Sequence, residues 1–260
     1  MKFGEVCAGI SAASLAWAPL GWSAAWFAEV DPFASAVLKH HHADVPNHGN
    51  MVKLIDRLLT EPSDDTADIW GIDALMGGCP CQDFSISGLR ASLSGDRGNL
   101  TLEFIRLADA VDDIRRAHGL APIWIVYENV PGLHSVADNA FGSFMGGLVG
   151  SDAAVKPLPK RGWTGAGVVS GPRRSAAWRL SDAQYHGLAQ RRNRIFVVAG
   201  GSAGTWGPPD ALLPIIESMS WHSAPRRETG KEVAGSIAAR TKGGGGAGQA
   251  FGGNNSGGGN

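Results

Sequence analysis

The sequence predicts an α/β protein with a doubly wound, mainly parallel sheet. Short apolar segments alternate with helix-like segments over the first 130 residues, as is typical of right-handed crossovers between parallel strands. The chain has 260 residues, 43% hydrophobic and 18% charged, which suits a globular protein with one sizeable core. Small or charged residues follow several apolar segments, where ligands bind in open α/β sheets.

Strands and helices are expected in alternating order. Apolar segments predict strands at residues 3–7, 25–29, 72–76, 123–128 and 195–199. Helical patterns fall at residues 12–18, 32–41, 52–60 and 100–117. The last helix carries apolar residues at helical spacing, which fall on one face: Leu100, Phe104, Leu107 and Val111.

Charge is divided unevenly along the chain. The formal net charge is −1, yet residues 1–150 hold 9 Lys and Arg against 18 Asp and Glu, and residues 151–260 hold 14 against 6. A basic second half suits contact with phosphate groups. Beyond residue 200, prolines and then glycines dominate the sequence. We therefore expect the sheet in residues 1–200, followed at 201–260 by an irregular region with a flexible tail.

The cysteines are too few for a disulfide framework, and a bridge between Cys79 and Cys81 would be strained. A reducing cytoplasm is therefore the expected location. A metal site at these two residues would need further ligands, and the adjacent histidines at 40–42 would point in different directions from one helix. The sequence therefore predicts no metal.

One uncharged segment competes with a cytoplasmic location. Residues 6–28 are long enough for a membrane span. Pro19 and several Ser and Gly residues count against a span, and Glu5 stands where a signal peptide has a positive flank. We expect no contact with membranes.

Two candidate ligand contacts follow the first two predicted strands. The small residues at 7–11 form a turn that opens a helix, where a ligand can approach the backbone; a plain tight turn is an equal alternative. Glu29 follows about twenty positions later, a spacing that suits the hydroxyls of a ribose. The alternative for Glu29 is an exposed surface acid.

Candidate chemistry follows the later strands. The segment at 77–85 carries Cys81, a possible nucleophile if its thiolate is favoured. Glu128 ends another strand, where a half-buried carboxyl can serve as an acid. Arg192 and Arg194 alternate along an extended segment, so both side chains point to one side, toward a phosphate or a polar ring edge; a solvated basic edge is the alternative.

Taken in order, these segments resemble the C5-cytosine DNA methyltransferases, particularly those of phages. The matching stretches are the first turn, "WFAEVDPFASAVLKHH", "GGCPCQDFS", "DRGNLTLEF", "ENV" and "QRRNRIFVV". The resemblance covers roughly residues 1–200. It implies a Rossmann-like methyltransferase domain that binds S-adenosylmethionine, followed at 201–260 by part of a target-recognition region.

The resemblance also implies roles for the candidate residues. The Cys81 thiolate would add to carbon 6 of a flipped-out cytosine, and Glu128, Arg192 and Arg194 would hold and stabilise the ring. Residues that would bind S-adenosylmethionine are Cys7, Gly9, Ile10, Glu29, Asn50, Met51, Pro80 and Leu100. Residues that would contact double-stranded DNA are Gln82, Ser85, Gln190 and Arg191. The protein is expected to act as a monomer.

The sequence departs from the family pattern in three respects. Cys7, Ser11 and Ala12 stand where the family has a Phe and paired glycines, so an aromatic contact to the cofactor is lost. Asn50 replaces an acidic residue that meets the adenine amine, although its carbonyl can accept the same bond. The last two family motifs are not found, so we expect a chain that stops before them and binds the cofactor weakly.

Three alternatives remain open at this stage. A tRNA cytosine-5 methyltransferase shares the same motifs and scaffold. A catalytically silent remnant that binds nucleic acid or a partner would account for the missing motifs. A thiol hydrolase built on Cys81 lacks an evident order of Cys, His and Asn.

Overall fold

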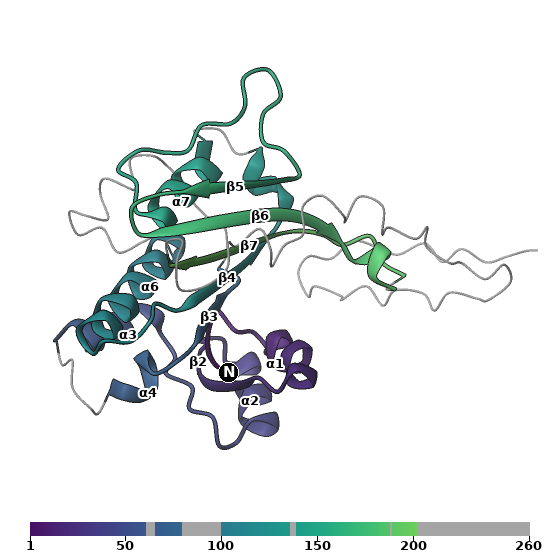
Figure 1. The fold of residues 1–260 in the computed structure, drawn as a ribbon. Helices are drawn as coiled ribbons and strands as arrows, with labels where there is room; N and C mark the ends of the chain where they lie inside the picture. The colour runs from purple at the N-terminus through teal and green to yellow at the C-terminus, as the bar shows by residue number, and fades with distance from the viewer. Residues whose placement is uncertain (61–65, 80–99, 136–138, 188, 202–260) are drawn as a thin grey trace, which may run out of the picture. The chain divides into compact units, whose positions relative to one another are not determined.

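The computed structural model describes residues 1–60, 66–79, 100–135, 139–187 and 189–201 (Figure 1). All of them lie in the first of two compact units, Met1–Arg226 and Arg227–Asn260. The predicted division at residue 200 concerns residues outside these ranges and stays a prediction. Among the described helices, none is long and apolar enough to cross a membrane.

The described residues form a seven-stranded sheet of order β2-β1-β3-β4-β7-β6-β5. Its parallel half comprises β1 (Lys2–Val6), β2 (Ser23–Ala28), β3 (Ala74–Gly77) and β4 (Trp124–Asn129). Its antiparallel half comprises β5 (Ala166–Ser170), β6 (Arg174–Asp182) and β7 (Asn193–Gly201). The predicted α/β class is confirmed, with the antiparallel half as an addition.

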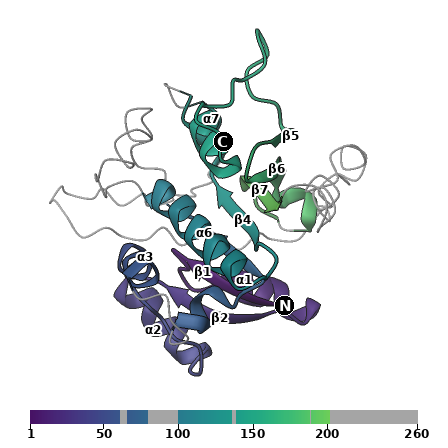
Figure 2. The same ribbon diagram turned by 60° about the vertical axis from the view of Figure 1, so that its left-hand side comes forward.

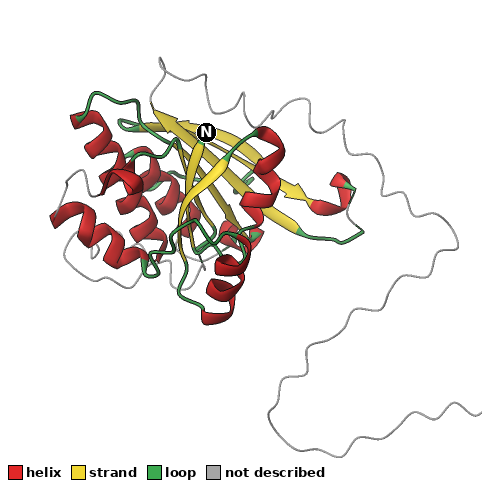
Figure 3. Cartoon of the chain, turned by 90° about the horizontal axis from the view of Figure 1, so that it is seen from below, coloured by secondary structure: helices red, strands yellow, loops and turns green. Residues whose placement is uncertain are grey.

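Helices cover both faces of the sheet (Figure 3). One face carries α1 (Ala12–Trp17) and α2 (Pro32–His41). The other carries α3 (Met51–Thr60), α4 (Ala67–Trp70), α6 (Leu100–Ala117) and α7 (Ala140–Val149). Within the described ranges, three short 3-10 helices link these elements: η1 (Ala18–Leu20), η3 (Pro131–His134) and η5 (Ala183–His186).

The elements predicted from apolar pattern are all present, with ends shifted by at most two residues. Helices α2 and α6 match their predicted ranges residue for residue. Strands β5 and β6 and helix α7 were not predicted. On the predicted apolar face of α6, Phe104, Leu107 and Val111 are fully buried, whereas Leu100, the first residue of the helix, is 38% exposed.

The long helix α6 lies between α3 and α7 (Figure 2) and packs closely on the parallel strands. A Cβ atom added at Gly77 of β3 would lie 2.5 Å from Cε2 of Phe104, so a glycine is needed there for the helix to approach. The apolar side chains of α6 join those of the strands in one core cluster. Burial of this face holds the parallel half together.

A buried ion cluster ties α6 to both halves of the sheet. Arg174, at the start of β6, has no exposed surface, and its guanidinium donates to Asp112 at 2.6 Å and to Asp109 at 2.6 Å. The second oxygen of Asp112 accepts a hydrogen bond from the backbone N–H of Ile123, just before β4, at 2.8 Å. The carboxyl group of Asp112 therefore joins one helix to two strands.

We expect Arg174→Met to lower the free energy of unfolding by about 3–5 kcal/mol, because it leaves the buried carboxylate of Asp112 without its counter-ion. Urea denaturation measures this change. The matched control is Arg116→Met on α6, where an exposed arginine pairs with Asp113 and the expected loss is at most about 1 kcal/mol. Equal losses in the two variants would contradict this account of the cluster.

Candidate functional site

Four of the described candidate residues, Cys7, Glu128, Arg192 and Arg194, lie at the edge of the sheet where β1, β3 and β4 end and β7 begins. A cavity of about 680 Å³ opens at this edge. Its polar lining comes from four separate segments: Glu5, Cys7, Glu128, Ser181, His186, Arg192 and Arg194. Parallel strands bring their carboxyl ends to one edge, and β7, being antiparallel to β4, brings its first residues to the same edge.

Glu128 and Arg194 form the closest ion pair of the cavity. The Nε atom of Arg194 lies 2.8 Å from Oε1 of Glu128, and Arg192 lies 3.8 Å from the same oxygen. Glu128 pairs with Phe196 in the sheet, so Arg194, two residues earlier on β7, reaches the same face of the sheet diagonally. The structure therefore brings these three candidate residues together.

The backbone before β7 is held by Asp182, a residue that the sequence analysis missed. Its carboxylate accepts hydrogen bonds from the backbone N–H of Arg192 at 3.0 Å and of Gln184 at 3.1 Å. Gln190 and Arg191 lie on this connection and are exposed. The signal for Asp182 was available, since aspartate commonly caps a turn through its own side chain.

The turn after β1 is held in an unusual conformation by Glu29. Cys7, Gly9 and Ser11 all have φ between 50° and 57°. One carboxylate oxygen of Glu29 accepts from the N–H of Gly9 at 2.7 Å, and the other accepts from the two N–H groups that follow Glu29. Nothing lies within 4 Å of a Cβ atom added at Gly9, and Ile10 is 60% exposed. The turn therefore offers open space for a ligand.

Glu29 is itself anchored by Asn47, a second residue that was missed. The side chain of Asn47 accepts from the N–H of Glu29 at 2.9 Å and donates to its carbonyl at 3.1 Å. Asn50 is exposed, and its side-chain oxygen accepts from the N–H of Val52 at 2.8 Å, at the start of α3. Met51 is buried in the core, so this predicted cofactor contact lies away from the exposed surface.

Four predicted site residues, Pro80, Cys81, Gln82 and Ser85, lie outside the described residues. Cys79 is the last described residue before them. Its carbonyl accepts a hydrogen bond from the side chain of Asn129 at 3.0 Å. Asn129 is the residue after Glu128. One strand end therefore both carries the candidate acid and anchors the backbone two residues before Cys81.

Glu5 lines the same cavity and was not recognised as a candidate. It is 5% exposed, and the hydroxyl of Ser11 donates to its carboxylate at 2.5 Å. Burial raises the pKa of Glu5 to about 7; the hydrogen bond from Ser11 lowers it, and the nearby charge of Glu29 raises it further. An acidic residue within an apolar strand was the signal that could have identified it.

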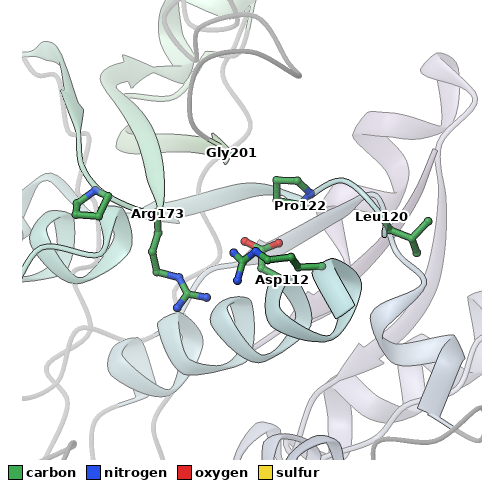
Figure 4. A pocket seen from close by; sticks show the side chains of 7 residues that line it. Asp112, Leu120, Pro122, Arg173 and Gly201 are labelled. Carbon is green, nitrogen blue, oxygen red and sulfur yellow. The ribbon is translucent and has the colours of Figure 1, made fainter. Parts of the chain in front are cut away.

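A second cavity, of about 340 Å³, lies at the opposite edge of the sheet (Figure 4). Its lining includes Arg173, Arg116 and Asp112 beside apolar residues such as Pro122. Each of the two arginines is paired with Asp113. Among the described residues, no group of three or more His, Cys, Asp or Glu side chains is arranged to hold a metal ion.

The chain is similar to known DNA methyltransferases. A family model for C-5 cytosine-specific DNA methylases matches residues 1–206. The chain is 46% identical to the DNA N-6-adenine-methyltransferase of Escherichia phage P1, over 91% of this chain and 33% of the relative. It is 27% identical to the Type II methyltransferase M2.BsuMI of Bacillus subtilis, over 76% of this chain and 42% of that relative. The chain thus spans less than half the length of these two relatives.

Solved structures share the fold. Dnmt2 methyltransferase of S. pombe matches with a TM-score of 0.52 and 14% identity, over 88% of this chain and 56% of that one. A mutant of DNMT2 from Spodoptera frugiperda matches with a TM-score of 0.50 and 18% identity, over 79% of this chain and 51% of that one. At these identities the likeness concerns the fold alone.

The raised pKa of Glu5 predicts a pH-dependent stability. The folded state binds the Glu5 proton more tightly than the unfolded state, so its contribution is fully present below pH 4.5 and is lost as the pH rises through about 7. The loss amounts to about 3 kcal/mol, at 1.36 kcal/mol for each pKa unit. Glu5→Gln should remove this pH-dependent loss of stability.

Urea denaturation of the wild-type chain and Glu5→Gln between pH 4 and pH 8.5 tests this prediction. The difference between the two curves isolates Glu5, because all other titrating groups are common to both. The variant should gain stability relative to the wild type as the pH rises. A difference that does not change with pH would show that Glu5 is not perturbed.

Proposed function

This chain belongs to the C-5 cytosine-specific DNA methylase family, and from that premise we propose that it transfers a methyl group from S-adenosylmethionine to carbon 5 of a cytosine in double-stranded DNA. The observation that carries the proposal is the pairing of Glu128 with Arg194 at 2.8 Å. The pair lines a cavity at the edge of the sheet where such enzymes would need their reactive groups.

The reaction needs a nucleophile because carbon 5 of cytosine reacts weakly with electrophiles. In the proposed mechanism, the Cys81 thiolate adds to carbon 6 of the ring. The addition raises the electron density at carbon 5, which can then accept a methyl group. Loss of the carbon 5 proton and release of the Cys81 sulfur complete the reaction. The hydrogen bond from Asn129 to the carbonyl of Cys79 supports this role, since it fixes the backbone close to Cys81.

Glu128 and the two arginines stabilise the electron-rich ring. Glu128 holds the exocyclic amine and donates a proton or a hydrogen bond to ring nitrogen 3 as negative charge develops there. Arg194 fixes the orientation of the Glu128 carboxyl group, and Arg192 adds positive charge nearby. Because all three are held by paired strands and by Asp182, little rearrangement is required during the reaction.

The turn after β1 fits the cofactor in two respects. Open space beside Gly9 allows close approach to the backbone, and exposed Ile10 offers an apolar surface. Gly9, Ile10 and Glu29 would hold the cofactor together with Cys7, and Asn50 would meet the adenine. S-adenosylmethionine, when bound, supplies an electrophilic methyl group.

The target base must leave the duplex, because carbons 5 and 6 are shielded by stacking. Extrusion costs a few kcal/mol. Gln190 and Arg191 are exposed on the connection before β7, and we assign them, with Gln82 and Ser85, to contacts with the DNA. Their position next to Arg192 and Arg194 would place the DNA over the cavity.

Methylation of the adenine amine is a second candidate, because the phage P1 relative is named an N-6-adenine methyltransferase. That name describes a protein of which this chain matches one third. An exocyclic amine accepts a methyl group directly, so no cysteine adduct is formed on that route. The covalent adduct and the identity of the methylated base therefore distinguish the two candidates.

We expect a covalent complex between the chain and DNA in which 5-fluorocytosine replaces cytosine, formed only with S-adenosylmethionine present. Fluorine cannot leave carbon 5 as a cation, so the Cys81 adduct persists and is seen on a denaturing gel. Cys81→Ser should abolish it, whereas the matched control Cys79→Ser should retain it. Absence of the adduct in the wild type, or its persistence in Cys81→Ser, would contradict the mechanism.

Nucleoside analysis of methylated products completes this test. The proposal requires 5-methyldeoxycytidine from duplex DNA. N6-methyldeoxyadenosine without an adduct would support the second candidate. Methylation of tRNA in preference to DNA would assign the activity to the RNA branch, and absence of any transfer or cofactor binding would support a silent remnant.

We expect Arg194→Lys to lower kcat about 10²-fold, because lysine cannot reproduce the fixed guanidinium contact with Glu128. The matched control is Arg192→Lys, which changes a 3.8 Å contact of a half-exposed side chain and should lower kcat less than about tenfold. Single-turnover methyl transfer measures both. Equal losses would contradict the separate roles of the two arginines.

A further inference from the structure

Two thiols meet at the wall of the candidate site. The Sγ atoms of Cys7 and Cys79 lie 3.3 Å apart and share a hydrogen bond. The residues come from neighbouring parallel strands, since Val6 of β1 pairs with Gly77 of β3; Cys7 follows β1 directly, and Cys79 follows β3 after one residue. Neither thiol is the nucleophile of the proposed mechanism, so the pair requires its own explanation.

The two thiols differ in their access to solvent. Cys7 is half-buried and lines the 680 Å³ cavity, so a small molecule can reach its sulfur. Cys79 is 1% exposed, and its backbone is fixed by the hydrogen bond from Asn129. The Cys7 thiol is therefore accessible from solvent, and the Cys79 thiol is buried in contact with it.

A disulfide between them requires little movement. The S–S bond is about 2.05 Å long, so the sulfurs must approach each other by about 1.3 Å from their present 3.3 Å. Residues at the ends of neighbouring strands about 4.8 Å apart lie within the reach of a disulfide. A bridge from Cys79 to Cys81, by contrast, would close a strained loop of only three residues.

We propose that Cys7 and Cys79 form a redox-sensitive modification site, which small-molecule disulfides such as oxidised glutathione convert to an intramolecular disulfide. The site itself is independent of the reaction assigned above. Its expected effect, weaker binding of S-adenosylmethionine by the oxidised chain, rests on the proposed function.

The exchange takes place in two balanced steps. The Cys7 thiolate attacks one sulfur of oxidised glutathione, forming a mixed disulfide and releasing one glutathione thiolate. The Cys79 thiolate then attacks the Cys7 sulfur, forming the intramolecular bond and releasing the second glutathione. The two protons lost by the cysteines are taken up by the two released thiolates, so two cysteines are oxidised and one glutathione disulfide is reduced.

The environment favours Cys7 as the first nucleophile. Its hydrogen bond with Cys79 lowers the pKa of the Cys7 thiol, an effect that burial and the charge of Glu29 oppose without cancelling. Cys7 begins the turn whose Gly9 N–H binds Glu29. A bond to Cys79 draws the Cys7 sulfur away from the cavity and joins that turn to the segment after β3, so the two can no longer adjust separately to a ligand.

Peptide mapping of the full chain tests the site directly. After incubation with oxidised glutathione and capping of remaining thiols, mass spectrometry should find the peptides that contain Cys7 and Cys79 joined, with the loss of two hydrogens. The same link should form in Cys81→Ser. A stable glutathione adduct on Cys7 without the link, a Cys79–Cys81 bridge, or no modification would each overturn the proposal.

Calorimetric titration with S-adenosylhomocysteine measures the effect on the proposed cofactor site. Oxidation should weaken its binding to the wild-type chain at least tenfold, and dithiothreitol should restore it. Cys7→Ser removes the first nucleophile, so the oxidant should leave the affinity of that variant unchanged, and a tenfold loss in that variant would overturn the effect. Failure of the reduced chain to bind S-adenosylhomocysteine would contradict the proposed function. The joined Cys7 and Cys79 peptides would still show whether the disulfide forms.

Discussion

Glu128 and Arg194 meet because β7 runs antiparallel to β4, with Phe196 opposite Glu128. A parallel strand at this position would end, not begin, at the functional edge, and its first residues would lie at the other side of the sheet. Reversal of one strand thus adds a guanidinium group to an edge otherwise formed by the ends of parallel strands. The same reversal sets the place of Arg192, because its N–H is bound by Asp182 at the end of β6. Strand direction therefore determines which charges face the cavity.

The position of Arg194 relative to Glu128 depends in turn on how the antiparallel strands are fixed to the rest of the sheet. Asp112 of α6 binds Arg174 at the start of β6 and the N–H of Ile123 just before β4. Both contacts lie at the edge opposite the cavity. A buried carboxylate with several partners has few alternative positions, because any displacement leaves charge uncompensated in the interior. The ion cluster at one edge thus constrains the spacing of β4 and β6 across β7, and with it the geometry at the other edge.

Apolar pattern predicts the parallel half well, because its strands are short runs of mostly apolar residues that alternate with helical segments. It fails for β5 and β6, whose sequences mix Gly, Ser and Arg with short apolar runs, and their burial comes from partners distant in the chain. Of the candidate site, Glu128, Arg192 and Arg194 could be found because charged residues flank apolar segments. Glu5 and Asp182 could not be found in the same way, since their importance depends on which groups lie nearby after folding. Motif resemblance suggested Cys81, and its position lies outside the described residues.

The cavity contains two glutamates, Glu128 and Glu5, whose neighbouring groups differ in charge. Glu128 faces two arginines, so its carboxylate has compensating positive charge within 4 Å. Glu5 accepts a hydrogen bond from the neutral hydroxyl of Ser11 and lies near the negative charge of Glu29, and burial raises its pKa to about 7. Near neutral pH a substantial fraction of Glu5 is therefore uncharged, which reduces the negative charge of the cavity while the arginines keep theirs. Under the proposed function an anionic nucleic acid brings one base into this cavity, and such a balance would lower the electrostatic cost of its approach, even though the surrounding half of the chain is acidic.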